Sequence, residues 1–245
     1  MSGQLSRRAF FWVTAAEASL LAFGCARTDG VVPTTADGEP LEEVAALPPL
    51  PPAQPDLENP FLIDRNIAMD TVDDWLGRPD AVYRDMRMIH DPADYEAIGG
   101  DSELSITIEG FRITPFPFIG TLQALPVAGA YEGDCLFDVE WDGADVASVQ
   151  PRYEESMQIL EELFPKDKAI FIMCGGAGYA FMMRQLLSYL GWNESRLYNL
   201  GGAWDYVGRY PVELVRHEGG ETRYMLWRGD IVDFGFEHLT PLRSF

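Results

Sequence analysis

The sequence predicts an α/β protein in which a mainly parallel central sheet is flanked by helices, because strand-like segments alternate with helix-like segments. The clearest strand, 169–173, is continuously apolar, as is typical of a strand covered on both faces. Apolar residues recur at helical spacing on either side of it, namely Tyr153, Met157, Leu160 and Leu163 before it and Met183, Leu187 and Leu190 after it. Gly191 provides a stop signal for the second helix.

A cysteine and a glycine-rich turn follow this strand directly. Cys174 is succeeded by Gly175, Gly176, Ala177 and Gly178 before the helical pattern begins. The glycines let backbone N–H groups point inward without obstruction by a Cβ atom, and a helix N-terminus adds about half a positive charge. We expect the helix terminus to lower the pKa of the Cys174 thiol by about one unit. Such a site suits a thiolate, a persulfide or a bound anion.

Several segments together resemble the rhodanese family. That family carries its catalytic cysteine in a short loop between a central parallel strand and the following helix, as in 169–180 here. The run 197–204 resembles the closing segment of the family, and 81–87 resembles its early strand that ends in D-x-R. Further matching segments are 71–76, 94–95 and 190–192. The resemblance covers roughly residues 66–206, with a divergent middle between Gly99 and Val149.

The resemblance implies a rhodanese-like fold and a sulfurtransferase or sulfur-carrier activity. Cys174 would accept a sulfane sulfur as a persulfide from a small sulfur-containing anion and pass it to a thiol acceptor. The amides of the following loop would hold the substrate, and this loop consists of Gly175, Gly176, Ala177, Gly178 and Tyr179. Asp85 and Arg87 would support the site by bracing the loops around it, and a direct part in the function is the alternative. No cofactor is implied.

Two functions other than sulfur transfer are also compatible with these residues. Active members of the family usually place a basic residue after the cysteine, and the loop here has none, so we expect poor thiosulfate turnover. The alternative is a weak or inactive rhodanese-fold binding module for an anion or an extracytoplasmic protein. A third possibility is thiol–disulfide exchange with Cys135, which lies in a segment of alternating polarity and is expected on a strand as a buried, inert thiol.

Charge and histidine spacing exclude some functions. The net charge of −21 argues against nucleic-acid binding, which requires a basic surface. The histidines at 90, 217 and 238 lie far apart and lack metal-ligand spacing, so no metal site is expected.

The N-terminal residues are predicted to be a targeting signal and not part of the folded domain. Arg7 and Arg8 precede a short apolar run, which resembles a twin-arginine export signal over 1–24. Cys25 directly ends this run, as in a lipoprotein, where its sulfur is lipidated. The proline-rich segment 25–60 is predicted to be a linker, and 61–245 the rhodanese-like domain. We therefore expect an extracytoplasmic lipoprotein anchored to a membrane of the cell envelope.

Two further segments carry structural predictions. Residues 212–216 and 222–227 flank Glu218-Gly219-Gly220, which predicts an added C-terminal β-hairpin. The segment 111–120 concentrates aromatic residues and prolines, which favours core or loop packing and leaves open a wall over the active loop.

Overall fold

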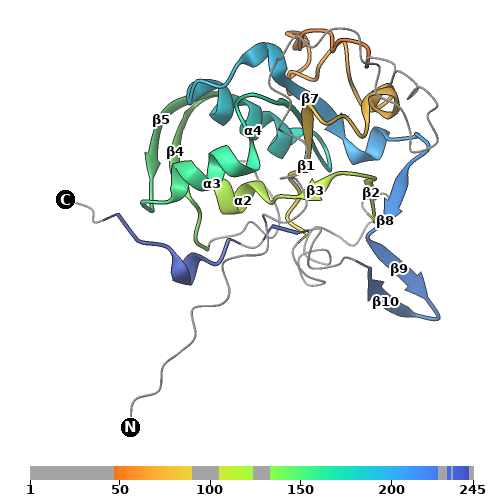
Figure 1. Cartoon of the computed structure of the whole chain (residues 1–245). Helices are drawn as coiled ribbons and strands as arrows, with labels where there is room; N and C mark the ends of the chain where they lie inside the picture. Colours follow the sequence, from red (N-terminus) through yellow and green to blue (C-terminus); the bar gives the residue numbers. More distant parts are fainter. Residues whose placement is uncertain (1–46, 90–104, 124–132, 226–230, 233, 243–245) are drawn as a thin grey trace, which may run out of the picture. The chain divides into compact units, whose positions relative to one another are not determined.

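The computed structural model describes residues 47–89, 105–123, 133–225, 231–232 and 234–242, which are coloured in Figure 1. Within this part, residues from Leu50 onward belong to one compact unit. The predicted export signal, Cys25, the first part of the predicted linker and the 94–95 segment lie outside the described residues.

A parallel sheet of four strands in the order β3-β1-β6-β7 forms the centre of this unit. The strands are β1 (Ala81–Asp85), β3 (Arg112–Ile113), β6 (Ala169–Cys174) and β7 (Leu197–Gly202). All residues of β6 are buried, which agrees with its continuously apolar sequence. The predicted α/β class with a mainly parallel central sheet is therefore confirmed.

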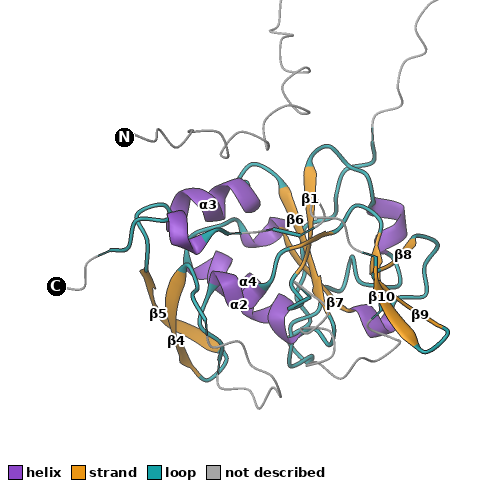
Figure 2. Cartoon of the chain, turned by 90° about the horizontal axis from the view of Figure 1, so that it is seen from below, coloured by secondary structure: helices purple, strands orange, loops and turns teal. Residues whose placement is uncertain are grey.

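The helices flank this sheet. They are α2 (Phe116–Ile119), α3 (Ser156–Leu163) and α4 (Gly178–Tyr189), with short 3₁₀ helices at η1 (Val72–Trp75), η3 (Glu194–Arg196), η4 (Ala203–Asp205) and η5 (Phe236–His238). Figures 1 and 2 show α2, α3 and α4 together on one side of β1, β6 and β7. The predicted stop at Gly191 is confirmed, because its φ of 88° ends α4, and the N–H of Trp192 donates to the carbonyl oxygen of Leu187.

The two faces of β6 belong to two separate hydrophobic cores. Ile170, Ile172 and Cys174 pack into the core that contains α3 and α4. Phe171 on the other face stacks between Tyr83 of β1 and Tyr198 of β7, with ring centroids 5.1 and 4.8 Å apart. Cys174 thus faces the helical side of the sheet.

Three antiparallel pairs accompany the parallel sheet. β4 (Phe137–Asp142) pairs with β5 (Asp145–Pro151), β2 (Ile106–Ile108) with β8 (Pro211–Glu213), and β9 (Val215–Glu218) with β10 (Glu221–Tyr224). The segment 212–216, which we expected to be a single strand, is divided between β8 and β9. Leu214 separates them because its side chain is fully buried and its N–H donates to the carbonyl oxygen of Ser105.

The folded unit begins earlier than predicted. The N–H of Ala53 donates to the carbonyl oxygen of Ser195, and the hydroxyl of Tyr198 donates to that of Pro51, at 2.8 and 2.6 Å. Leu50 and Ala53 also pack against the core on the Phe171 side of the sheet. The prediction of a linker up to residue 60 is therefore wrong for 50–60, where proline-rich sequence lies against the domain. Within the described residues, no helix combines the length and hydropathy needed to cross a bilayer.

Candidate functional site

Cys174 is the last residue of β6 and lies at the carboxyl edge of the parallel sheet. Ligands of open α/β sheets bind at this edge. The chain turns through residues 175–177 and enters α4 at Gly178, so the predicted order of strand, cysteine, turn and helix is present. Ala177 adopts a left-handed conformation, with φ of 69°, directly before the helix. This turn returns the backbone toward the cysteine.

Two backbone N–H groups of α4 act on the sulfur of Cys174. They belong to Ala180 and Tyr179, and both lower the pKa of the thiol. Tyr179 was among the predicted loop residues, whereas Ala180 was missed, because the helical turn and not the glycine content determines which amides reach the sulfur. The loop residues Gly175, Gly176, Ala177 and Gly178 surround the site without any basic side chain.

Burial dominates the chemistry of this thiol. Only 3% of Cys174 is exposed, and this desolvation raises its pKa from 9.0 to about 11, against the effect of the two amides. The two amides lower this pKa, as predicted for the helix terminus, but the predicted net decrease of about one unit is wrong, because the pKa is raised overall. The helix terminus acts in the expected direction, but removal of the thiolate from water has the larger effect. At pH 7 a thiol with such a pKa is only about one ten-thousandth ionised.

The strand beside the cysteine presses closely against its loop. Cys174 is in register with Gly202 of β7, and a Cβ atom added to Gly202 would lie 2.2 Å from the carbonyl oxygen of Gly175. Gly201 adopts a φ of 104° where the register of β6 and β7 shifts. Glycine is therefore required at 202 by the close approach of β7 to the loop, and at 201 by the positive φ.

Aromatic side chains lie against the loop from two elements. The ring of Trp204, in η4, lies 2.8 Å from the position that a Cβ atom on Gly176 would take. The ring of Phe116, in α2, stacks on Tyr179 with centroids 6.1 Å apart. Of the segment 111–120, Phe116 thus lies against the loop. All four residues of α2, including Phe116, are buried.

Asp85, the last residue of β1, forms a buried ion pair with Arg87. The Nε of Arg87 donates to both carboxylate oxygens of Asp85, at 2.9 and 3.0 Å, and both residues are almost fully buried. A terminal nitrogen of Arg87 also donates to the carbonyl oxygen of Ile106, and the hydroxyl of Thr107 donates to Asp85. The pair thus connects β1 with β2. It also affects Cys174, because Asp85 raises the pKa of the thiol and Arg87 lowers it.

Cys135 has different surroundings from Cys174. We expected Cys135 to lie on a strand, but it precedes β4, which begins at Phe137. Its Sγ donates to the carbonyl oxygen of Phe137 at 3.2 Å. Burial raises its pKa to about 11, and the charges that influence it are Arg152, Asp138 and Asp134. Both thiols are free. Thiol–disulfide exchange between Cys135 and Cys174 stays a prediction.

Two other features of the site bear on ligands. In the part of the chain that the structure describes, no group of three or more histidine, cysteine or acidic residues is placed to hold a metal ion. A cavity of about 450 Å³ lies beside β2 and β8, and Cys174 is not among its lining residues. Comparisons of the chain with models of protein families, with curated protein sequences and with solved structures found no match.

Proposed function

We propose that residues 50–242 form a rhodanese-like domain that serves as a binding module with a quiescent cysteine, and not as an efficient sulfurtransferase. The observation that carries this proposal is the burial of Cys174, which leaves 3% of it exposed and raises its pKa to about 11. A sulfurtransferase needs an accessible thiolate near neutral pH. The absence of a basic side chain in 175–179 removes the usual means of neutralising an anionic donor.

The surface beside the loop is suited to a protein partner, which under this proposal is extracytoplasmic. Trp204 is 52% exposed and Val207 is 87% exposed, and both follow β7 at the carboxyl edge of the sheet. Exposed aromatic side chains of this kind commonly anchor protein interfaces. The partner would thus contact the face that a catalytic rhodanese uses for substrate.

A sulfur carrier is the second candidate, and one observation favours it. The N–H groups of Tyr179 and Ala180 act on the sulfur of Cys174 and favour its anionic form. In that function the Cys174 thiolate would attack the sulfane sulfur of thiosulfate, the sulfur–sulfur bond of the donor would break, and sulfite would leave with the electron pair. An acceptor thiolate would then remove the outer sulfur and regenerate Cys174.

Intact mass spectrometry after exposure to thiosulfate, combined with alkylation by iodoacetamide over a pH series, separates the two candidates. For a binding module we expect no sulfur adduct on Cys174, and an alkylation rate that stays low at neutral pH and rises toward pH 11. The variant Cys174→Ser separates sulfur addition and alkylation at Cys174 from the same reactions at Cys25 and Cys135. Gain of one sulfur atom at Cys174 with rapid alkylation at pH 7 would refute the quiescent thiol and support the sulfur carrier.

We further propose that the chain is exported and held at a membrane of the cell envelope by lipidation of Cys25. The paired arginines and the apolar run that ends at Cys25 support this location. Cys25→Ser is expected to release the protein into the soluble fraction when cells are fractionated. Continued partition of the variant with membranes would discard the lipid anchor.

A further inference from the structure

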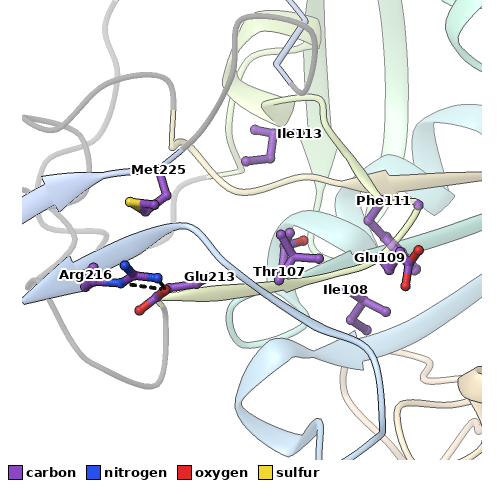
Figure 3. A pocket seen from close by; sticks show the side chains of 10 residues that line it. Thr107, Ile108, Glu109, Phe111, Ile113, Glu213, Arg216 and Met225 are labelled. Carbon is purple, nitrogen blue, oxygen red and sulfur yellow. Dashed lines mark hydrogen bonds and ion pairs between the residues drawn. The ribbon is translucent and has the colours of Figure 1, made fainter.

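A cavity of about 450 Å³ beside β2, β3 and β8 has no part in the site at Cys174 (Figure 3). Its volume lies within the range of about 300–1,000 Å³ that is typical of small-molecule sites. Ile108, Phe111 and Ile113 line it and are buried in the protein. Val212 and Met225 line it as well but are unusually exposed for apolar residues. An apolar ligand body would remove these two side chains from water.

Among the described residues that line the cavity, two are acidic and one is basic. Arg216 lies at one end and is matched by Glu213, to which its Nε donates at 2.9 Å, and by Glu218 at 3.8 Å. The Arg216 guanidinium lowers the pKa of the Glu213 carboxyl, so that Glu213 stays ionised. Arg216 therefore has no charge left unmatched for an anionic ligand.

Glu109 supplies a second carboxylate at the opposite end of the cavity (Figure 3). No ion pair joins its side chain to another residue in the described part of the chain. It also lines a neighbouring cavity that contains Asp73. Among the described lining residues of the larger cavity, two carboxylates and one guanidinium sum to a negative charge, within a chain of net charge −21. Such a field attracts cations and repels anions.

From this arrangement we infer that the cavity binds an organic cation, with the apolar body on Ile108, Phe111 and Met225 and the positive group beside Glu109. The inference is independent of any chemistry at Cys174. Its geometric basis is an apolar cavity with a different charged group at each end. At one end the Glu109 carboxylate forms no ion pair with the described residues, and at the other Arg216 is paired with Glu213.

Two aryl probes of opposite charge test the ligand class. The full chain, with ¹³C-labelled methionine methyl groups, is titrated with phenylpropyltrimethylammonium and separately with phenylpropanesulfonate. Met225→Leu assigns the Met225 methyl signal among the nine methionines. We expect saturable shifts of that signal with the ammonium and none with the sulfonate. Equal shifts with both probes, or no saturable shift with the ammonium, would overturn the inference.

Charge variants then locate the site. Val212→Lys adds an ammonium at the rim of the cavity and is expected to weaken binding of the cationic probe about tenfold. Leu57→Lys adds the same charge at an exposed position that lines neither cavity, and it should leave binding of the probe nearly unchanged. Glu109→Gln should weaken binding about threefold, as expected for an exposed charge pair, and Glu221→Gln should not. Equal effects of the two lysine variants would place the probe elsewhere and refute the site.

Discussion

The substitution Gly202→Ala tests the close approach between β7 and the cysteine loop. Gly202 has φ of −101° and ψ of 144°, an ordinary extended conformation that alanine adopts without strain. The added Cβ would nevertheless lie 2.2 Å from the carbonyl oxygen of Gly175 and 3.0 Å from the Cα of Gly176. Both neighbours are backbone atoms, so relief requires movement of the strand or the loop by roughly an ångström, and not rotation of a side chain.

The expected loss of stability follows from this overlap. Overpacking of a well-packed site costs about 1–3 kcal/mol, and a clash between backbone segments belongs at the upper end of that range. Alanine stabilises by about 0.4–1 kcal/mol because it restricts the unfolded chain. The net decrease in the free energy of unfolding should therefore be about 2 kcal/mol. With a urea m-value of about 2 kcal/mol per M, the midpoint of unfolding falls by about 1 M.

Urea denaturation followed by tryptophan fluorescence measures this change, and Gly143→Ala is the matched control. Gly143 lies in the turn between β4 and β5 with φ of 61°, and a Cβ atom there meets nothing within 4 Å. Its substitution should cost only the left-handed strain, about 1 kcal/mol. Displacement of the loop in Gly202→Ala should also speed alkylation of Cys174. A loss below about 0.5 kcal/mol with unchanged alkylation would refute the close approach.

Three other perturbations probe the buried groups and the strained turn of the site. Above pH 9 the unfolded chain loses the Cys174 proton while the folded chain, with a pKa of about 11, retains it, so stability should fall by at most about 1.4 kcal/mol per pH unit between pH 9 and 11. Cys174→Ala should show a shallower decline in this window, and an identical profile would contradict the buried thiol. Arg87→Leu leaves the Asp85 carboxylate buried without its partner and should cost about 3–5 kcal/mol in denaturant unfolding. The double variant with Asp85→Leu should recover part of this loss, and a double variant no more stable than the single one would argue against the ion-pair account. Ala177→Gly removes left-handed strain of about 1–2 kcal/mol, which stabilises the folded protein, but it gives the unfolded chain more conformational freedom, which costs about 0.4–1 kcal/mol. The free energy of unfolding should therefore rise by about 0.5 kcal/mol, as measured by thermal unfolding. A lower melting temperature in that variant would mean that Ala177 is not held in the left-handed region.

Local patterns in the sequence were sufficient for the main elements around the cysteine. The apolar run 169–173 predicted the central strand, and apolar spacing from Ala180 with Gly191 predicted the helix and its end. These features depend on residues close together in the chain, so periodicity reveals them. The residues at the end of the strand could be named as a candidate site for the same reason, because they adjoin it in the chain.

Contacts between distant segments decided the remaining features. Proline-rich sequence before residue 60 resembled a linker, but the hydrogen bond from Tyr198 to Pro51 places part of it on the domain. The strand expected over 212–216 is divided because Leu214 enters the core. Neither partner can be read from the local sequence, since each lies far away in the chain.

Cys174 shows most clearly the difference between features that local sequence predicts and features that depend on packing. Residues close together in the chain were enough to place Cys174 at the end of a buried strand, next to a glycine-rich turn and a helix N-terminus. The near-complete burial of this thiol, which raises its pKa to about 11, became visible only in the folded protein. The physical reason is that a helix terminus acts locally through the backbone, whereas desolvation is the sum of all the packing around the sulfur.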